Sequence, residues 1–438
     1  MKFKLLLMGV VCSFAFTMVF SQEEEKIDTL SVVDQRLTLV EDYVASSKKL
    51  KISGYLQAQW QSGQLDSLSS PPQDLRVGET LNTIEKNAGA SQINRFGIRR
   101  GRIKLAYEDF GCTGVLQFDL TEKGLSLKDA YLNVVDPWIG YFNVKAGVFD
   151  RPFGYEISYS SSRRESPERS RVFQTLFPDE REVGGMIAIQ APKGSPWAVL
   201  RLEAGLFNGN AIGPDADSRK DFIGHLIYSN ATPSLKYGFG FSYYNGATPQ
   251  LNRNIFSMQG DNFTTSAGDS TGYSKREYFG FDANLNLASA LGVTSVRAEY
   301  LFGTQPGLSN SSTSPKYSSK GYTGAGTSVS DTYIRNFQGG YLMLVQDVMD
   351  TKHSIILKYD WYDPNTKVAG TKIGVAESKT GKADIAYSTL GLGYMYRMNN
   401  NIRLTAYYDL VTNEKTSVKG YFENVNDNLL TIRLQYKF

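Results

Sequence analysis

Hydrophobic and polar side chains alternate one by one through most of the chain from Leu50 onward. The last segment alternates most regularly, with the apolar residues Leu430, Ile432, Leu434, Tyr436 and Phe438. The same pattern recurs in residues 279–287, 296–302 and 402–410. A period of two residues is typical of a β-strand with two unlike faces. These segments run to about ten residues, whereas strands of soluble sheets usually have five or six.

Alternation alone does not separate a soluble β-sandwich from a membrane barrel, because strands of both have one apolar and one polar face. Three further features favour the barrel. The strands are long enough to cross a bilayer at a tilt, aromatic residues recur near strand ends, and short connections alternate with long ones. The short connections include 136–138 and 398–401, and the long ones are 61–92, 151–182, 246–274 and 303–331. In a water-soluble domain, four such long loops would count against the fold.

The number of strand-like segments indicates the size of the barrel. Sixteen segments start near Leu50, Phe96, Thr113, Leu125, Tyr141, Val183, Ala198, Arg219, Leu235, Lys275, Val293, Phe337, His353, Ala386, Asn401 and Asn428. The chain ends at Phe438 on an amphipathic strand, which resembles the recognition signal of bacterial outer-membrane barrels. We therefore predict an all-β fold for residues 50–438, a 16-stranded antiparallel transmembrane β-barrel with a short N-terminal helix before it.

The N-terminal region reads as an export signal followed by a helix. Lys2 and Lys4 precede an apolar stretch that ends at Ser21, so residues 1–21 are predicted to be a secretory signal peptide. Residues 22–49 form the predicted helical leader. Its apolar residues, spaced three and four apart, are Leu30, Val33, Leu37, Val40 and Val44. This seam fits either an ordinary amphipathic helix or a short oligomeric coiled coil. Export and the barrel together predict the bacterial outer membrane as the location.

Composition narrows the class further. Aromatic residues make up 13% of the chain, which excludes disorder, and no run past the N-terminus approaches the ~18 apolar residues of a spanning helix. The chain has two Cys, and signal cleavage would leave Cys112 alone, so a disulfide scaffold is excluded. Without Lys2 and Lys4, the chain has 45 basic and 44 acidic residues. The mature chain is therefore almost neutral.

If the apolar faces meet lipid, the polar faces line the lumen, and these carry more bases than acids. The inward basic candidates are Arg100, Arg102, Lys104, Lys145, Arg201, Arg297, Lys358, Arg397, Arg403, Arg433 and Lys437. The inward acids are Asp119, Glu203, Asp282, Glu299, Asp360 and Asp409. A low-dielectric wall around charges of one sign focuses their field, so this partition predicts an anion-attracting lumen.

The densest basic run is 95–104. Arg100, Arg102 and Lys104 share one face of a strand at about 7 Å spacing, which suits the passage of an anion from one cation to the next. Arg95 and Arg99 are expected near the rim. A solvated face or a nucleic-acid patch is the alternative reading of such a run. Export and the interleaved lipid face argue against it, so no nucleic-acid partner is predicted.

A second dense feature is the long connection after Phe149. Its basic residues are Arg163, Arg164, Arg169, Arg171 and Arg181, and its acids are Glu165, Glu168, Asp179, Glu180 and Glu182. Such a loop could fold into the barrel, where its acids would pair with wall arginines and its spare arginines would charge the passage. A surface loop with mutually paired charges is the alternative.

Three motifs carry a resemblance to a known family. At 99–103, 127–132 and 145–154 the sequence resembles the phosphate-selective porin O and P family of Gram-negative outer membranes. The resemblance is strongest over about residues 50–210. It implies a 16-stranded barrel that assembles as a homotrimer, with loops folded into the lumen and a pathway of Arg and Lys for phosphate or related anions. Arg100, Arg102 and Lys145 lie in matching motifs, whereas Asp150-Arg151 stands where relatives often place a lysine.

The predicted function is a passive, anion-selective, phosphate-like diffusion channel that contacts outer-membrane lipid. The predicted anion pathway comprises Arg100, Arg102, Lys104, Lys145, Arg163, Arg164, Arg169, Arg171, Arg181, Arg297, Lys358 and Arg403. A general or oligomer-specific porin, or a surface-binding adhesin barrel with loops 258–274 and 303–331, remains open. No cofactor and no enzyme activity are predicted, because the only histidines, His225 and His353, lie in no recognisable Ser or Asp constellation.

Overall fold

The computed structural model describes residues 49–64, 92–215, 217–251, 253–315 and 331–438. The predicted signal peptide and nearly all of the predicted leader helix lie outside the described residues. Lys51–Phe438 form one compact unit. Among the described residues, no helix is both long and apolar enough to cross a membrane.

The described part of the chain is built almost entirely from strands. The first nine are β1 (Leu50–Gln64), β2 (Gln92–Asp109), β3 (Cys112–Thr121), β4 (Gly124–Val135), β5 (Phe142–Asp150), β6 (Arg181–Gln190), β7 (Leu200–Phe207), β8 (Asp221–Ala231) and β9 (Leu235–Pro249). The others are β10 (Asn254–Gln259), β11 (Asn262–Ala267), β12 (Tyr273–Ser289), β13 (Gly292–Gly307), β14 (Thr332–Asp347), β15 (His353–Asp363), β16 (Tyr387–Arg397), β17 (Ile402–Asn413) and β18 (Leu429–Lys437). Five short helices are α4 (Arg171–Leu176), η1 (Pro196–Val199), η2 (Gly370–Lys372), η3 (Ala376–Ser378) and η4 (Lys382–Asp384).

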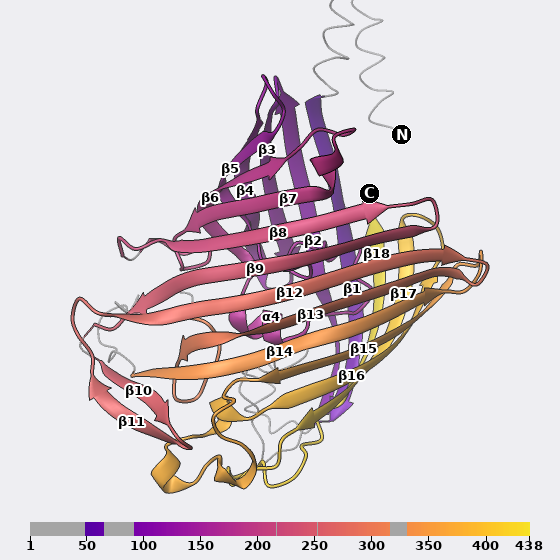
Figure 1. The fold of residues 1–438 in the computed structure, drawn as a ribbon. Helices are drawn as coiled ribbons and strands as arrows, with labels where there is room; N and C mark the ends of the chain where they lie inside the picture. Colours follow the sequence, from indigo (N-terminus) through magenta and orange to yellow (C-terminus); the bar gives the residue numbers. More distant parts are fainter. Residues whose placement is uncertain (1–48, 65–91, 216, 252, 316–330) are drawn as a thin grey trace, which may run out of the picture. The chain divides into compact units, whose positions relative to one another are not determined.

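Sixteen of the 18 described strands close into an antiparallel ring, and the other two, β10 and β11, form a hairpin outside it. Each ring strand pairs with its neighbour in the chain, β9 pairs with β12, and β1 pairs with both β2 and β18 (Figure 1). The predicted 16-stranded barrel is therefore confirmed. The observed strand starts lie within five residues of the predicted ones, and the largest shift is from Phe337 to Thr332.

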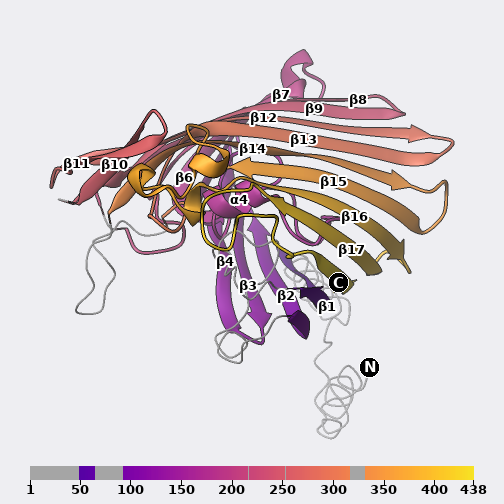
Figure 2. The ribbon, with the colours of Figure 1, turned by 90° about the horizontal axis from the view of Figure 1, so that it is seen from below.

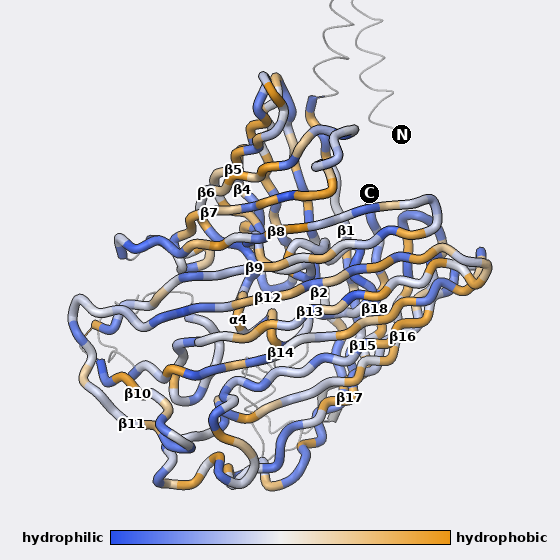
Figure 3. Tube along the Cα trace, in the orientation of Figure 1, coloured by the Kyte–Doolittle hydropathy of each residue, from blue (hydrophilic) through white to orange (hydrophobic). Residues whose placement is uncertain are grey.

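The two-residue period orients the side chains as predicted. On β18, Ile432 and Leu434 are 37% and 47% exposed on the outer face, whereas Arg433 and Gln435 are 5% and 4% exposed on the inner face. The same alternation of hydrophobic and hydrophilic positions runs along the other strands (Figure 3). An exposed apolar outer face is what a barrel presents to lipid.

Most connections at one end of the barrel, which we call the turn end, are short, and most at the other end, the loop end, are longer. At the turn end, two residues, Phe110 and Gly111, link β2 to β3, both with positive φ. At the loop end, residues 151–180 connect β5 to β6, and 364–386 connect β15 to β16. The predicted alternation of short and long connections is found among the described residues with one exception, the two-residue connection 122–123 that joins β3 to β4 at the loop end.

The connection 246–274, expected to be an irregular loop, contains the β10–β11 hairpin. β9 continues to Pro249, and β10 then pairs in parallel with the first residues of β14. These residues extend past the paired part of β15, so their free edge is available for a further strand. Phe256 stacks on Tyr333 at a centroid distance of 4.3 Å and fixes the hairpin there. The sequence pattern did not indicate this pairing.

Part of the inner face is apolar, which corrects the prediction that polar side chains line the whole lumen. Phe177 meets the rings of Tyr244 and Tyr278 at 6.2 and 5.7 Å, and all three side chains are buried. These tyrosines point inward from β9 and β12. The helix α4, which precedes Phe177, lies inside the ring of strands (Figure 2). The loop that carries α4 therefore buries this side of the interior and leaves the opposite side to polar groups.

Candidate functional site: the inner loop and two basic cavities

The connection 151–180, here called the inner loop, is fixed inside the barrel at its start by Glu299 of β13. The Glu299 carboxylate accepts the backbone N–H groups of Tyr155 and Glu156 at 2.8 and 2.5 Å, and the hydroxyl of Tyr341 at 2.8 Å. Gly154 precedes these donors with φ of 64°, and a Cβ there would collide with the Glu299 carboxylate. Only glycine fits this turn.

A second attachment is Glu168, which joins the inner loop to β2 and β18. Arg99 donates two hydrogen bonds of 2.7 Å to its carboxylate, and Arg100 and Arg433 donate at 3.0 and 2.9 Å. Burial alone would raise the pKa of Glu168. The positive charges of Arg100, Arg99 and Arg433 outweigh burial and hold this pKa well below its usual range. Glu168 therefore stays ionised at neutral pH.

Two more acids of the inner loop pair with inward cations of the far wall. Lys358 of β15 lies 2.9 Å from Glu156, and Arg297 of β13 holds Glu165 with bonds of 2.7 and 3.1 Å. Burial alone would raise the pKa of Glu156, but Lys358 and nearby Arg164 hold it below its usual value.

Arg403 of β17 completes these attachments by donating to the carbonyl oxygens of Arg163 and Arg164 at 3.1 and 2.8 Å. The inner loop thus contacts the barrel wall on several sides. The alternative of a surface loop whose charges pair only with one another is wrong.

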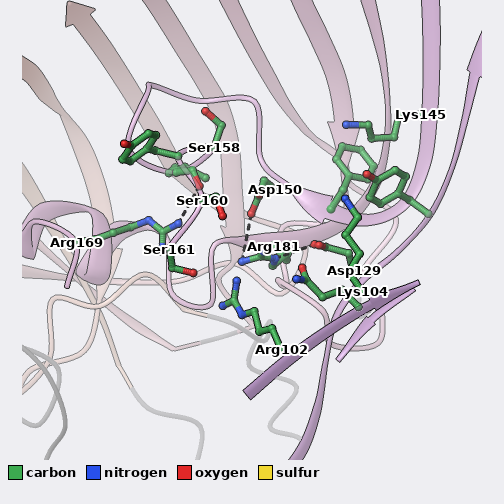
Figure 4. A pocket seen from close by; sticks show the side chains of 15 residues that line it. Arg102, Lys104, Asp129, Lys145, Asp150, Ser158, Ser160, Ser161, Arg169 and Arg181 are labelled. Atoms are coloured by element: carbon green, nitrogen blue, oxygen red, sulfur yellow. Dashed lines mark hydrogen bonds and ion pairs between the residues drawn. The ribbon is translucent and has the colours of Figure 1, made fainter. Parts of the chain in front are cut away.

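Two cavities lie beside the inner loop, along β2 to β6. The loop-side cavity, of about 270 Å³, is lined by Arg99, Arg100, Arg102, Asp119, Lys128, Arg164, Glu168, Arg169, Phe173, Gln174, Phe177, Pro178, Asp179 and Glu180. The turn-side cavity, of about 220 Å³, is lined by Arg102, Lys104, Gln117, Asp129, Tyr131, Lys145, Phe149, Asp150, Ile157, Ser158, Tyr159, Ser160, Ser161, Arg169 and Arg181 (Figure 4). Arg102 and Arg169 line both, so the two cavities adjoin.

The charge around these cavities is positive. Together the linings contain nine Arg or Lys residues and six Asp or Glu residues, a formal excess of three positive charges. Positive charge is concentrated around the cavities, because the whole chain of 438 residues carries a net charge of only +3. Cations that gather along one wall favour anions in a narrow passage.

The predicted pathway residues fall into distinct groups. Those that line a cavity are Arg100, Arg102, Lys104, Lys145, Arg164, Arg169 and Arg181. Arg297, Lys358 and Arg403 instead hold the inner loop, and Arg100 does both. Arg163 is exposed, and Arg171 is buried with its guanidinium over the Tyr387 ring at 4.3 Å. The structure therefore does not bring all twelve residues to one passage.

The predicted run of cations on β2 shares one face, but its members differ in pairing. Arg100 pairs with Glu168, and Arg102 lies 3.4 Å from Asp119. The Lys104 ammonium forms no hydrogen bond or ion pair with any other described residue. Arg99, expected near the rim, instead reaches Glu168, which corrects that prediction.

Lys128 is a cavity residue that sequence reasoning missed. The pairing of β3 with β4 shifts between Gln117 and Phe118, so that Asp129 and Leu127 have partners while Lys128 between them has none. Such a bulge turns the extra side chain away from the regular alternation. Lys128 thereby lines the loop-side cavity. Strict counting of alternate positions does not reveal a bulge.

Both histidines have structural partners. His225 of β8 lies 2.9 Å from Asp282 of β12, a contact that sequence analysis did not identify. The two strands lie on either side of β9, where Gly240 leaves room for the contact. Nδ1 of His353 lies 2.6 Å from the hydroxyl of Tyr394. Among the described residues, no three or more His, Cys, Asp and Glu side chains are grouped to hold a metal ion.

Comparison with solved structures places this architecture in a known class. The chain matches no protein-family profile and no curated protein. It is similar to OprB of Pseudomonas putida, with a TM-score of 0.55, 10% identity and coverage of 90% of this chain and 95% of that one. It is also similar to OmpF of Salmonella typhi, solved with daunomycin, with a TM-score of 0.50, 12% identity and coverage of 89% and 97%.

A loop-deletion form of OmpT, an outer-membrane protein of Vibrio cholerae, matches with a TM-score of 0.50, 11% identity and coverage of 89% of this chain and 99% of that one. At such identities the likeness concerns the fold. The chain has the porin-type barrel fold. Membership of the phosphate-selective porin O and P family stays a prediction from the motifs quoted above.

Proposed function

We propose that the protein is a passive diffusion channel of the bacterial outer membrane that prefers anions. The observation that supports this best is the excess of basic side chains around the two adjoining cavities. Ions would pass along Arg102, Lys104, Lys145, Arg164, Arg169 and Arg181. The exposed apolar outer face and the predicted signal peptide support the outer membrane as the location.

The reversal potential in a KCl gradient across a planar bilayer tests this proposal. The purified protein is expected to give the sign of an anion-preferring channel, because the cavity cations concentrate chloride. A cation-preferring or non-conducting protein would contradict the proposal. A reversal potential near zero would favour the general porin for small polar solutes.

The motif resemblance also leads us to propose a homotrimer and inorganic phosphate as a solute. For the trimer, unheated detergent samples should migrate as a high-mass band that collapses to the monomer on boiling. For the solute, phosphate should reduce the chloride current at millimolar concentrations. A monomeric band without heating would contradict the trimer alone.

A further inference from the structure

The two cavities differ in the groups that face them. The loop-side cavity is lined largely by charged groups of both signs. Both cavities have aromatic side chains in their linings, but only the turn-side cavity adds a strip of neutral hydroxyls, residues 158–161 of the inner loop, beside the rings of Tyr131 and Phe149. Figure 4 shows the serines on one side of this cavity and Lys104 and Lys145 on the other.

The two lysines are available to a solute. The ammonium groups of Lys104 and Lys145 form no hydrogen bond or ion pair with another described residue. The Lys145 ammonium lies 4.9 Å from the Tyr131 ring centre and 5.3 Å from that of Phe149, which positions it over an aromatic surface. Arg181, by contrast, is engaged by Asp129 and Asp150.

The hydroxyl strip would contribute little to a bare anion that the lysines already attract. A deprotonated inorganic anion mainly accepts hydrogen bonds, whereas serine hydroxyls both donate and accept. Ser158 and Ser160 are exposed in the cavity, and Ser158 uses its proton on the carbonyl of Tyr155 at 3.1 Å, which leaves its oxygen free to accept. An acceptor of this kind needs a donor on the solute. A solute with its own hydroxyl groups supplies one.

The cavity is also large enough for more than a small ion. Its volume of about 220 Å³ far exceeds the ~10–15 Å³ that one water molecule needs. The combination of free cations, hydroxyls and aromatic rings matches a ring-shaped organic solute with one charged group.

We infer that the turn-side cavity is a binding subsite for a hydroxylated organic anion, a sugar acid or a sugar phosphate. The anionic group binds Lys104 and Lys145, and the hydroxyls of the sugar meet Ser158 and Ser160. This inference rests on the proposed anion channel and names the class of solute that binds there.

Block of the chloride current in planar bilayers tests the inference with matched pairs of solutes. Glucuronate should block half the current at about one tenth of the concentration that acetate requires, since two extra hydrogen bonds to neutral groups give about that factor. Glucose 6-phosphate should likewise block half the current at about one tenth of the concentration that inorganic phosphate requires. The sugar anion that blocks at the lower concentration identifies the preferred charged group. Uncharged glucose should not block.

Two variants locate the effect. Ser158→Ala should raise the half-blocking concentration of glucuronate about threefold, the effect of one lost hydrogen bond, and leave that of acetate unchanged. Ser234→Ala, an exposed serine in the turn between β8 and β9, is the control and should change neither.

Equal block by glucuronate and acetate, together with equal block by the two phosphates, would overturn the inference. If the KCl reversal potential still shows anion preference, the proposed function stands and only the subsite is wrong. A cation-preferring channel would overturn both. A sugar-dependent block that Ser158→Ala does not weaken would overturn the assignment of the hydroxyl strip.

Discussion

The interior of the barrel has two unlike halves on either side of the inner loop. Along β2 to β6, cavities with free and paired cations adjoin the loop. Along β9, β12 and β14, the loop packs Phe173 and Phe177 against inward aromatic side chains and leaves them buried. The strands of both halves alternate in the same way. An inward position therefore becomes part of a passage only where no other segment covers it.

Glu168→Gln, which detaches the inner loop from the wall of the basic half, is expected to have the largest effect on stability. The variant leaves Arg99, Arg100 and Arg433 without their shared carboxylate, and the loss of one partner of a buried ion pair costs about 3–5 kcal/mol. Thermal unfolding in detergent measures the cost, and the single-channel current should rise and fluctuate as the loop loosens. Glu423→Gln, which removes an exposed pair with Lys415, is the control and should cost at most about 1 kcal/mol. Equal stability of the two variants would contradict the anchoring role.

The aromatic half is tested by Phe177→Ala. Removing this buried ring should lower the free energy of unfolding by about 3 kcal/mol, because a cavity remains among Tyr244, Tyr278 and Phe153. Phe177 also borders the loop-side cavity, but it carries no charge, so all nine cavity cations stay and anion preference should change little. Phe422→Ala, at an exposed ring, serves as the control. A large loss of anion preference would contradict the claim that the charged side chains of the basic cavities set it.

The basic half is tested by Lys104→Gln combined with Lys145→Gln. Two of the nine cavity cations are lost, so the formal excess falls from three charges to one. One unit charge about 6 Å from an ion in water contributes roughly 0.7 kcal/mol, or about threefold in local concentration. The ratio of anion to cation permeability should fall by about threefold or more, with stability within about 0.5 kcal/mol of the wild type. Lys193→Gln, in an exposed turn, should leave the ratio unchanged.

The smallest effect is expected from a moderate change of pH. The pKa of Glu168 is lower in the folded protein than its ordinary value of 4.5, so its stabilising effect is complete above about pH 4.5 and is lost as pH falls through the folded pKa. The difference in thermal unfolding midpoint between the wild type and Glu168→Gln should stay constant from about pH 7 to pH 5 and shrink only in more acidic buffer. A difference that already shrinks near neutral pH would contradict the ionised state of Glu168.

The strand pattern predicted the barrel, its strand number and the inward direction of Arg102, Lys358 and Arg433, because those features depend on a period of two along single strands. It did not predict contacts between distant segments. Three features depend on where a long loop folds: the ion pairs of Glu168, the packing of Phe177 against aromatic side chains, and the β10–β11 hairpin. The alternation of polar positions predicted that Arg297 and Lys104 both point inward. Their different roles, Arg297 as an attachment point of the inner loop and Lys104 as an unpaired cation, became visible only from their contacts in the structure.

Selective labelling of two engineered thiols tests most directly which half carries the passage. In a Cys112→Ser background, which removes the one free thiol among the described residues, Ser158→Cys places a thiol in the turn-side cavity and Ser242→Cys places one in the buried aromatic half. We expect a negatively charged thiol reagent to alter the current through Ser158→Cys, faster than a positively charged one, and to leave Ser242→Cys unchanged. Labelling of Ser242→Cys with Ser158→Cys unaffected would contradict a passage along β2 to β6.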